Sequence, residues 1–413
     1  MAGLLAQRFR ESVSKLKDFR MKSETEFDVG YSTGFLTFDF ANGTMVHVRS
    51  NTKDMKYHSV GITDGSMVMV IGRSGCGKTT FCIQSASNIV RPFKTSCVFE
   101  DNIEGGLTAT RRATLSRFNS EELKDRFICR NSGITAENFY ERVKMIHDLK
   151  INNRADYEYD TGLCDDMGNR IYKLEPTVYI LDSIALLMPE KYTEEDELSG
   201  QMAATAAAKA NTAIFKRIIP MLKAANIILF VINHITQKVN LNPMMMTKAQ
   251  VSYLKPDETL PGGAAIVYLS NLMLRFDDKS KLKAEEGLGI NGALVDITFV
   301  KSRNNRAGTV ATLVFNQEYG YDEELSEYIL LKNNGRINGA GAFLYIGNHS
   351  ELKFAQKNFK EKLHTDPEFA KIFYDEVINV LMTNMKDNTE AFSSDIVDTA
   401  SIIMSKIREQ EAA

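Results

Sequence analysis

The sequence predicts an α/β protein with a mainly parallel sheet that is extended by antiparallel strands, with a helix before it and a small helical domain after it. Three observations predict this class. A glycine-rich motif, G-x-x-x-x-G-K-[ST], stands between an apolar strand and a helix. Buried apolar strands then alternate with helices, the pattern of a parallel sheet that is covered on both faces. Beyond residue 263, strand-like segments follow one another over short polar links, which favours antiparallel pairing.

The glycine-rich motif predicts a phosphate-binding loop, with Met67–Ile71 as its strand and Phe81–Val90 as its helix. Backbone N–H groups of such a loop form an anion-binding nest at a helix N-terminus. Lys78 would supply a charge for the β- and γ-phosphates, and the Thr79 hydroxyl would ligate Mg²⁺. A chance Gly/Ser turn is the alternative. The candidate nucleotide contacts are Gly72, Arg73, Ser74, Gly75, Cys76, Gly77, Lys78, Thr79 and Thr80.

The other parallel strands and their helices follow from apolar runs and from helical spacing. Between two of them lies a polar stretch, residues 150–173, that contains two glycines and predicts a hairpin or a surface insertion. The strands are expected at 97–101, 127–129, 177–182 and 226–233, and the helices at 136–149 and 200–224.

The two ends of the chain differ in pattern from its middle. Residues 4–22 have apolar residues at helical spacing, which predicts an amphipathic helix that packs either on its own domain or on a neighbouring subunit. Strand-like segments are expected at 264–276, 293–300 and 309–315, and a helical pattern runs from 354 to 407. We therefore divide the chain into an N-terminal oligomerisation helix (1–30), an ATPase core (31–346) and a C-terminal helical domain (347–413).

Composition restricts the compartment and the partners. The 413 residues are 44% hydrophobic and 25% charged, and no apolar run is long enough to span a bilayer. The N-terminus lacks the apolar core of a signal peptide, and five cysteines without paired spacing favour a reducing compartment, the cytoplasm. Because the net charge is −3, any nucleic-acid binding must come from local loops.

Acidic residues follow two of the predicted strands. Asp182 ends the apolar run that begins at Thr177, as in a Walker B motif, and would hold Mg²⁺ directly or through water. Hydrolysis also needs a group that positions the attacking water. Glu100, Asp101 and Glu104 are the candidates beyond the second strand, and each of them could equally be a solvated loop acid.

The strand after Walker B ends in Asn233-His234 and leads into a long loop. A polar residue at this strand end can touch the γ-phosphate and pass its state to the loop, although His234 could simply cap the strand. Loops this long inside compact domains are usually functional or disordered. Lysines with an interleaved aromatic suit single-stranded nucleic acid, and the candidates are Lys238, Lys248, Tyr253 and Lys255.

Six segments, taken in order along the chain, resemble one family. The segment Tyr31–Ala41 resembles the entry to the ATPase core of RecA, and the Walker B strand with its continuation resembles that of RecA as well. The remaining matches include the INH form found in phage recombinases of the UvsX kind. The six segments are Tyr31–Ala41, Leu181–Pro189, Val231–His234, Pro261–Ala265, Val300–Arg303 and Gly341–Tyr345. The chain thus resembles the RecA-family recombinases, above all the UvsX-like proteins of tailed bacteriophages.

The resemblance implies a RecA-like fold and an ATP- and Mg²⁺-dependent filament on single-stranded DNA that pairs it with homologous duplex DNA. It implies a homo-oligomer with ATP between subunits, single-strand-binding and mediator proteins as further candidate partners, and a place in the host cytoplasm if the protein is phage-encoded. Glu104 matches the glutamate that activates water, although this strand end is one residue longer than in RecA, so Glu100 and Asp101 stay open.

Other residues receive roles only through the resemblance. His234 would be the γ-phosphate sensor, and Lys301 and Arg303 would reach the neighbour's ATP. Gly262 and Gly263 would close the second DNA-binding loop, 235–263, and residues 188–203 would form the first. Arg111 stands where the family usually has a tyrosine near the adenine, and its guanidinium can stack on a base.

Three departures from the family pattern stand out. Residues 44–62 are longer than the RecA link, residues 150–173 have no counterpart, and the first DNA loop is acidic, which does not suit phosphates. Two rival functions share the core. One is a hexameric DnaB-like helicase, whose N-terminal domain is much larger than what precedes residue 30. The other is an ATP-gated regulator or loader without strand exchange. A structural protein with a dead ATP site fits poorly with intact Lys78, Thr79 and Asp182.

Overall fold

The computed structural model describes residues 28–49, 54–164, 170–192, 200–237, 253–261, 264–283, 288–303, 306–385 and 396–397. The helix predicted at 4–22 lies outside these ranges. None of the helices in the described part is long and apolar enough to cross a membrane.

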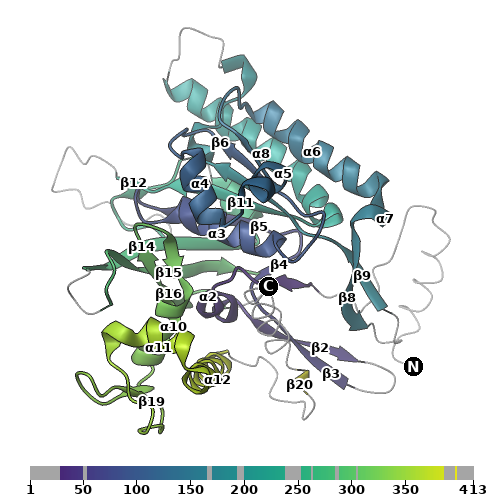
Figure 1. Ribbon diagram of the computed structural model, residues 1–413. Coiled ribbons are helices and arrows are strands. Elements are labelled where there is room, and N and C mark those ends of the chain that lie inside the picture. Colours follow the sequence, from purple (N-terminus) through teal and green to yellow (C-terminus); the bar gives the residue numbers. More distant parts are fainter. Residues whose placement is uncertain are drawn as a thin grey trace, which may run out of the picture.

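The centre of the molecule is a nine-stranded sheet with the order β17-β16-β15-β14-β5-β11-β10-β6-β7 (Figure 1). From β14 to β7 every neighbouring pair is parallel, and β15, β16 and β17 continue the sheet by antiparallel pairing. This confirms the α/β class and the mainly parallel sheet. The strands are β5 (Met67–Gly72), β6 (Val98–Asn102), β7 (Phe127–Arg130), β10 (Thr177–Asp182), β11 (Ile227–His234), β14 (Leu272–Leu282), β15 (Gly292–Ser302), β16 (Val310–Asn316) and β17 (Gly320–Asp322).

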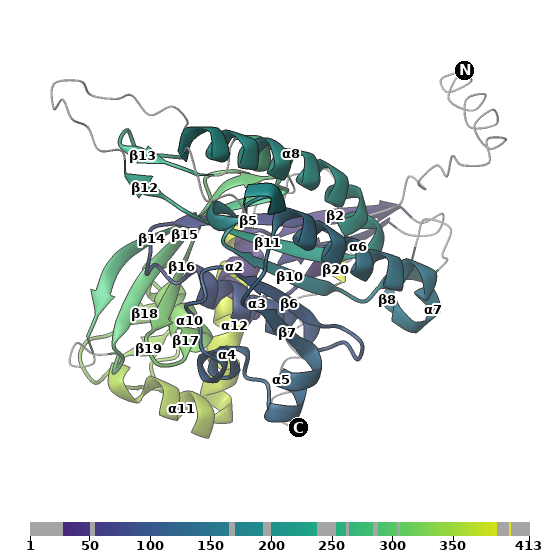
Figure 2. The ribbon, with the colours of Figure 1, turned by 90° about the horizontal axis from the view of Figure 1, so that it is seen from above.

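Helices cover both faces of this sheet, which explains why its inner strands are apolar on both sides. In Figure 2, α6 and α8 lie on one side of the strands, with α3, α4 and α5 on the other. The helices are α2 (Leu36–Ala41), α3 (Lys78–Val90), α4 (Ala109–Ser116), α5 (Ser120–Arg126), α6 (Ala136–Asn152), α7 (Arg154–Tyr157), α8 (Gly200–Ala225), α9 (Ala264–Leu269), α10 (Glu323–Asn333), α11 (Phe359–Thr365) and α12 (Pro367–Asn384).

Two buried clusters fill the space between the sheet and these helices. Along each central strand, alternate residues enter opposite clusters: Val68 and Val70 pack towards α3, whereas Met69 packs towards α6 and α8. The period of two along a strand produces this division. The central strands are therefore packed on both faces, which fixes the positions of the residues at their ends.

One predicted strand is wrong in its first half. The run Ala264–Leu269 forms helix α9, and β14 begins only at Leu272. Its β-branched and aromatic residues are typical of strands, but Ile266 and Val267 are buried in the cluster that also holds α8. Moreover, β14 runs parallel to β5, so the antiparallel extension starts one strand later than the sequence predicts.

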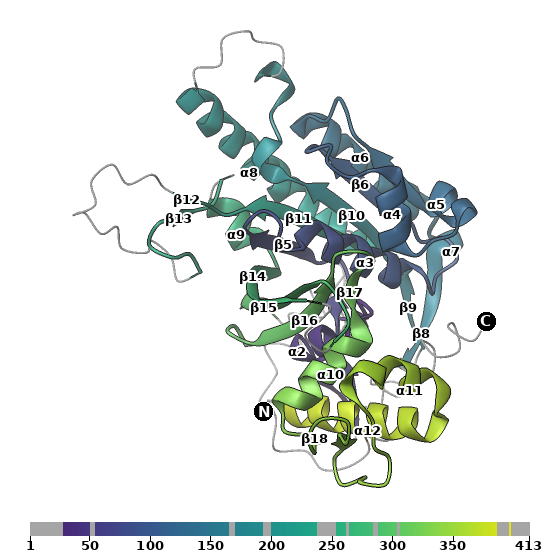
Figure 3. The ribbon, with the colours of Figure 1, turned by 60° about the vertical axis from the view of Figure 1, so that its left-hand side comes forward.

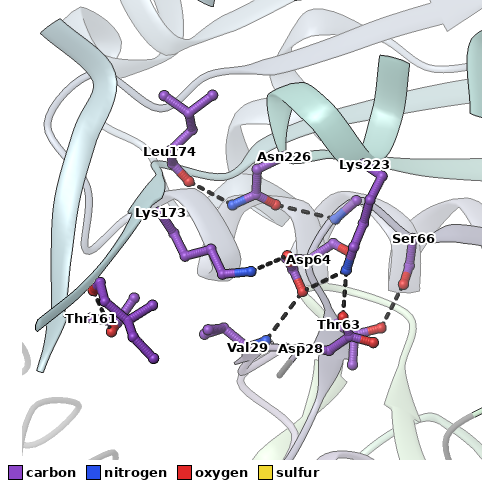
Figure 4. Close-up of polar contacts among 12 residues, drawn as sticks. Asp28, Val29, Thr63, Asp64, Ser66, Thr161, Lys173, Leu174, Lys223 and Asn226 are labelled. Atoms are coloured by element: carbon purple, nitrogen blue, oxygen red, sulfur yellow. Dashed lines mark hydrogen bonds and ion pairs between the residues drawn. The ribbon is translucent and has the colours of Figure 1, made fainter. Parts of the chain in front are cut away.

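The polar insertion predicted at 150–173 contains the end of α6, the short α7 and the hairpin of β8 (Glu158–Cys164) with β9 (Arg170–Leu174). Figure 4 shows how polar contacts join it to the core. Asp64 accepts a hydrogen bond from Lys173 of β9 at 3.0 Å and another from Lys223 of α8 at 3.2 Å. Asn226 donates to the carbonyl of Leu174 at 2.6 Å. Hydrogen bonds at the end of β9 thus attach the insertion to the core.

Smaller sheets flank the core. The long link at 44–62 contains the hairpin of β2 (Thr44–Arg49) with β3 (Asp54–Ser59), and β20 (Ile396–Val397) pairs with β3. β1 (Gly30–Tyr31) pairs with β4 (Ile62–Thr63), and β18 (Ile337–Asn338) pairs with β19 (Tyr345–Ile346). Short 3₁₀ helices cover Ile184–Leu186, Glu190–Tyr192 and Gln356–Asn358.

The C-terminal helices share a buried cluster with the core. Asp366 caps α12 by accepting a hydrogen bond from the N–H of Phe369, and Pro367 occupies the first turn, as expected for a helix start. Phe369 and Phe373 then pack with Leu325 of α10 and Phe40 of α2. In Figure 1, α11 and α12 lie at the end of the molecule that is remote from α6 and α8.

Candidate functional site

The candidate site lies at the carboxyl ends of β5, β11 and β10, where the parallel register brings their last residues together. His234 pairs with Gly72, and Asp182 pairs with Asn102. Such strand ends are where open α/β sheets bind ligands. The glycine-rich loop connects β5 to α3, as the sequence predicts. Its glycines are required by the backbone, because Gly75 and Gly77 both have a φ of 81°.

The glycine-rich loop packs tightly against β17. A Cβ at Gly77 would lie 2.4 Å from the hydroxyl oxygen of Tyr321, which is fully buried. That hydroxyl donates to the carbonyl of Cys76 at 3.3 Å. Gln84 of α3 also donates to the carbonyl of Tyr321 at 3.2 Å. The end of β17 therefore supports the loop, although nothing in the sequence marked Tyr321 as part of the site.

Lys78 is buried at the first position of α3. Its Nζ donates to the carbonyl oxygens of Gly72 at 3.0 Å and Arg73 at 2.7 Å, and it lies 3.5 Å from Nδ1 of His234. The ammonium is thus held inside the curve of the loop, beside the N-terminus of a helix. This arrangement of a cation, loop amides and helix dipole suits an anion.

Thr79 and Asp182 form a pair that suits a hard divalent cation. The Thr79 hydroxyl donates to Oδ2 of Asp182 at 2.6 Å. Burial raises the pKa of Asp182 to about 6, with Glu104 and Glu100 adding to the rise while the Thr79 hydrogen bond and Lys78 oppose it. Its buried Oδ1 makes no hydrogen bond to the described residues. A hydroxyl and a carboxylate with an unused oxygen fit Mg²⁺.

Two of the three candidate acids are already paired. Glu100 is fully buried, and its Oε2 accepts a hydrogen bond from Nε of Arg112 at 2.5 Å. Asp101 is fully buried as well, and its carboxylate accepts hydrogen bonds from Arg142 and from the hydroxyl of Tyr179. Both acids therefore serve to anchor helices α4 and α6 to β6.

Glu104 is placed differently, because it follows β6 and turns towards the end of β11. Its Oε1 lies 2.6 Å from Nε2 of His234, an ion-pair distance without hydrogen-bond geometry. Its side chain is 36% exposed, so solvent reaches it. One ligand atom from each of Glu104, Asp182 and His234 lies within 4.8 Å of the others. The site thus gathers the carboxylates of Glu104 and Asp182 and the imidazole of His234 beside the glycine-rich loop.

The end of β11 touches both the glycine-rich loop and the loop that follows β11. The N–H of Ile235 donates to the carbonyl of Gly72 at 3.1 Å. The Asn233 amide donates to the carbonyl of Pro261 at 2.7 Å. The pair Asn233-His234 therefore connects Lys78 with Pro261, near the end of the loop that follows β11.

Arg111 lies on α4 and reaches the turn between β16 and β17. Its guanidinium donates to the carbonyl oxygens of Gln317, at 3.1 Å, and Glu318. The same turn contacts α3, because Gln84 donates to the carbonyl of Tyr319 at 3.5 Å. Arg111 is thus beside α3, and base stacking by its guanidinium stays a prediction.

Lys301 lies at the end of β15 and Arg303 directly follows this strand, beside the start of β14. Lys301 pairs with Met273 near the start of β14, whereas the phosphate loop follows the end of the neighbouring parallel strand β5. Its Nζ donates to the carbonyls of Val267, Tyr268 and Ser270 at 2.7–2.9 Å, and burial together with Arg303 lowers the pKa of Lys301. Arg303 is exposed and donates to the carbonyl of Tyr268 at 3.2 Å. Both side chains thus lie towards the starts of β14 and β5, where the ammonium of Lys301 is held by carbonyls of α9.

Only part of the candidate DNA loop lies within the described residues. Lys238, Lys248, Gly262 and Gly263 are outside them, as are residues 193–199 of the acidic first loop. Tyr253 is half-buried and Lys255 is exposed. Both stand just before the short β13 (Glu258–Thr259), which pairs with β12 (Thr236–Gln237).

The structure also shows a charged cluster that sequence reasoning missed. Glu258 is buried and contacts Arg275 of β14 at 2.7 Å and Arg73 of the phosphate loop at 3.4 Å. These residues are 17 and 185 positions from Glu258 in sequence. No local pattern joins residues at such separations.

Comparisons with known proteins add no identification. No protein-family model matches the chain, and no curated protein matches it either.

Proposed function

We propose that this protein is an ATP-dependent recombinase that forms a filament on single-stranded DNA and pairs it with homologous duplex DNA. One observation carries the ATPase part of the proposal: Lys78, Thr79, Asp182, Glu104 and His234 converge on a glycine-rich loop at one end of the parallel strands. The ordered resemblance to RecA and UvsX proteins supports the recombinase part.

Each residue has a separate task in hydrolysis. The loop amides and Lys78 bind the β- and γ-phosphates of ATP, and the resemblance alone assigns Arg111 to the base. Thr79 and Asp182 hold Mg²⁺, which neutralises negative charge on the phosphates when it is bound. Glu104 accepts the proton of the water that attacks the terminal phosphorus, since Glu100 and Asp101 are committed to arginines. His234 orients Glu104, which its Nε2 contacts, and approaches Lys78 through Nδ1.

The position of Lys301 and Arg303 supports a site completed between subunits. Both cations lie beside the start of β14, whereas the glycine-rich loop follows the end of β5, and this separation favours contact with a nucleotide held by another copy of the chain. Cations that reach developing charge from a neighbour stabilise a phosphoryl-transfer transition state. Head-to-tail contacts of this kind generate open filaments unless the rotation closes a ring.

DNA binding is assigned to the loop 235–263. Asn233 and His234 join the phosphate site to that loop, so the bound γ-phosphate and the DNA affinity are coupled. A lysine-and-tyrosine loop suits unpaired bases, which can stack on an aromatic ring. Phosphate neutralisation by a few lysines makes the affinity fall with salt.

The decisive experiment measures the ATPase rate with and without single-stranded DNA and images the complexes by electron microscopy. The proposal predicts strong stimulation by single strands and extended filaments in the presence of a non-hydrolysable ATP analogue. Hexameric rings with ATP-driven unwinding of forked duplex would favour the DnaB-like helicase. ATP-dependent assembly without pairing of homologous DNA would favour the regulator or loader.

A further inference from the structure

Arg73, the second residue of the phosphate loop, contacts a carboxylate from a distant part of the chain. Its Nη2 lies 3.4 Å from Oε1 of Glu258, and the two side chains differ sharply in exposure, at 54% for Arg73 and 0% for Glu258. Within the described part of the chain, the guanidinium makes this one long contact, and about half of the side chain is exposed. A planar guanidinium in this setting can turn towards a second anion at small cost.

Glu258 has hydrogen-bond donors besides Arg73, although Arg275 is shared with Asp277, to which it donates at 2.7 and 3.0 Å. Arg275 donates to both of its oxygens, at 2.7 and 3.1 Å, and the N–H of Lys255 donates at 2.9 Å. Burial raises the pKa of Glu258, but the hydrogen bonds from Arg275 and Lys255 outweigh it and hold the pKa at about 2. Glu258 is thus a fixed anion, and Arg73 is its exchangeable partner.

Glu258 also holds the returning limb of the candidate DNA loop, residues 253–261. It lies on β13, which pairs with β12 directly beyond His234 (Figure 3). Arg275 donates to the carbonyl of Tyr253 at 2.7 Å in addition to its contacts with Glu258. One carboxylate therefore touches the phosphate loop, the neighbouring strand β14 and this limb.

We propose that Arg73 is a phosphate-binding residue shared between two anions, the terminal phosphate of a bound nucleotide and Glu258. Glu258 is a positioning residue that acts through Arg73 and couples nucleotide binding to the 253–261 limb. The triphosphate competes well because several of its oxygens accept charge-assisted hydrogen bonds from a guanidinium. When Arg73 turns to the nucleotide, the limb keeps Arg275 and loses its contact with the phosphate loop. This inference rests on the proposed ATP site.

A double-mutant cycle tests the sharing. The affinity for Mg²⁺ with AMP-PNP, a non-hydrolysable ATP analogue, is measured for the unmodified protein, Arg73→Ala, Glu258→Gln and the double variant. Arg73→Ala should weaken binding about tenfold, the effect of one charge-assisted hydrogen bond. Glu258→Gln should tighten it about threefold, because it releases Arg73 from a partly exposed ion pair. The double variant should match Arg73→Ala. As a control, Asp160→Asn, which removes a partly exposed ion pair with Arg170 on the β8–β9 hairpin, should leave the affinity unchanged.

A second readout follows the limb itself. Hydrogen exchange of residues 253–261 should accelerate about threefold when the analogue binds the unmodified protein, since a partly exposed ion pair is lost. In Arg73→Ala, the exchange rate of residues 253–261 should not change when the analogue binds. Because the Arg73 side chain is largely exposed, this variant should fold, and it provides the test even if Glu258→Gln does not fold. Two results would overturn this inference and leave the proposed function standing. One is weaker binding of the analogue to a folded Glu258→Gln variant, and the other is an acceleration of exchange in Arg73→Ala as large as in the unmodified protein. No binding of the analogue to the unmodified protein would reject the proposed function together with it.

Discussion

Glu104→Gln separates catalysis from stability, because Glu100 and Asp101 are buried within β6, whereas Glu104 follows the strand and is partly exposed. Glu104 is 36% exposed and makes no buried ion pair, so its neutralisation should leave the melting temperature nearly unchanged. We expect ATP to bind but to be hydrolysed at least about 100-fold more slowly, as for the loss of a general base. That factor corresponds to a barrier higher by about 2.7 kcal/mol.

Glu100→Gln and Asp101→Asn should give the opposite result. Each removes the charge partner of a largely buried arginine, Arg112 at 7% or Arg142 at 19% exposure. Breaking such a pair costs about 3 kcal/mol or more of folding free energy. Residual hydrolysis per folded molecule should stay within a few-fold of the unmodified rate.

Steady-state ATPase assays and urea denaturation of the three variants provide the comparison, with nucleotide binding measured separately. The reasoning is refuted if Glu104→Gln folds normally and hydrolyses ATP at the unmodified rate. It is refuted equally if Asp101→Asn is stable and catalytically dead, because then the register at the end of β6 assigns the wrong acid.

Three further predictions address the phosphate loop, the subunit interface and a buried lysine. Lys78→Ala should abolish ATP turnover in a folded protein, and turnover near the unmodified rate would reject the assignment. Mixing Lys78→Ala with a Lys301→Ala, Arg303→Ala double variant should restore some ATPase, because one interface can combine an intact loop with intact cations; no activity at any ratio, despite confirmed assembly, would indicate a site within one subunit. Burial lowers the pKa of Lys150 from 10.5 to about 7, so between these values the unfolded chain binds more protons and stability rises with pH. Urea denaturation at pH 7 and pH 9 should show a larger gain for the unmodified protein than for Lys150→Met, and equal gains would contradict this.

The sequence predicts the fold well where local pattern and tertiary packing agree. The strand before the phosphate loop and the strand ending at Asp182 are both apolar and doubly covered, so their runs are unmistakable. The prediction of a strand at Ala264–Leu269 is wrong because these residues favour a strand only locally. Burial against α8 and hydrogen bonds from Lys301 to the last carbonyls of the segment favour a helix.

The sequence predicts only those residues of the candidate site that belong to recognisable motifs. Lys78, Thr79 and Asp182 belong to motifs with fixed chemistry, and the structure brings them together. The distinction between Glu104 and its neighbours depends on Arg112 and Arg142, which come from other helices. Only the three-dimensional structure shows such partners, and the same holds for Glu258.

The central claim, homologous pairing driven by ATP on single-stranded DNA, is tested most directly by a joint-molecule assay. Purified protein is incubated with a single-stranded oligonucleotide, a supercoiled duplex that contains its sequence, Mg²⁺ and ATP. We predict joint molecules that require ATP and homology and that are absent with Lys78→Ala. Single-strand-stimulated ATPase without joint molecules, at every ratio of protein to DNA, would contradict it.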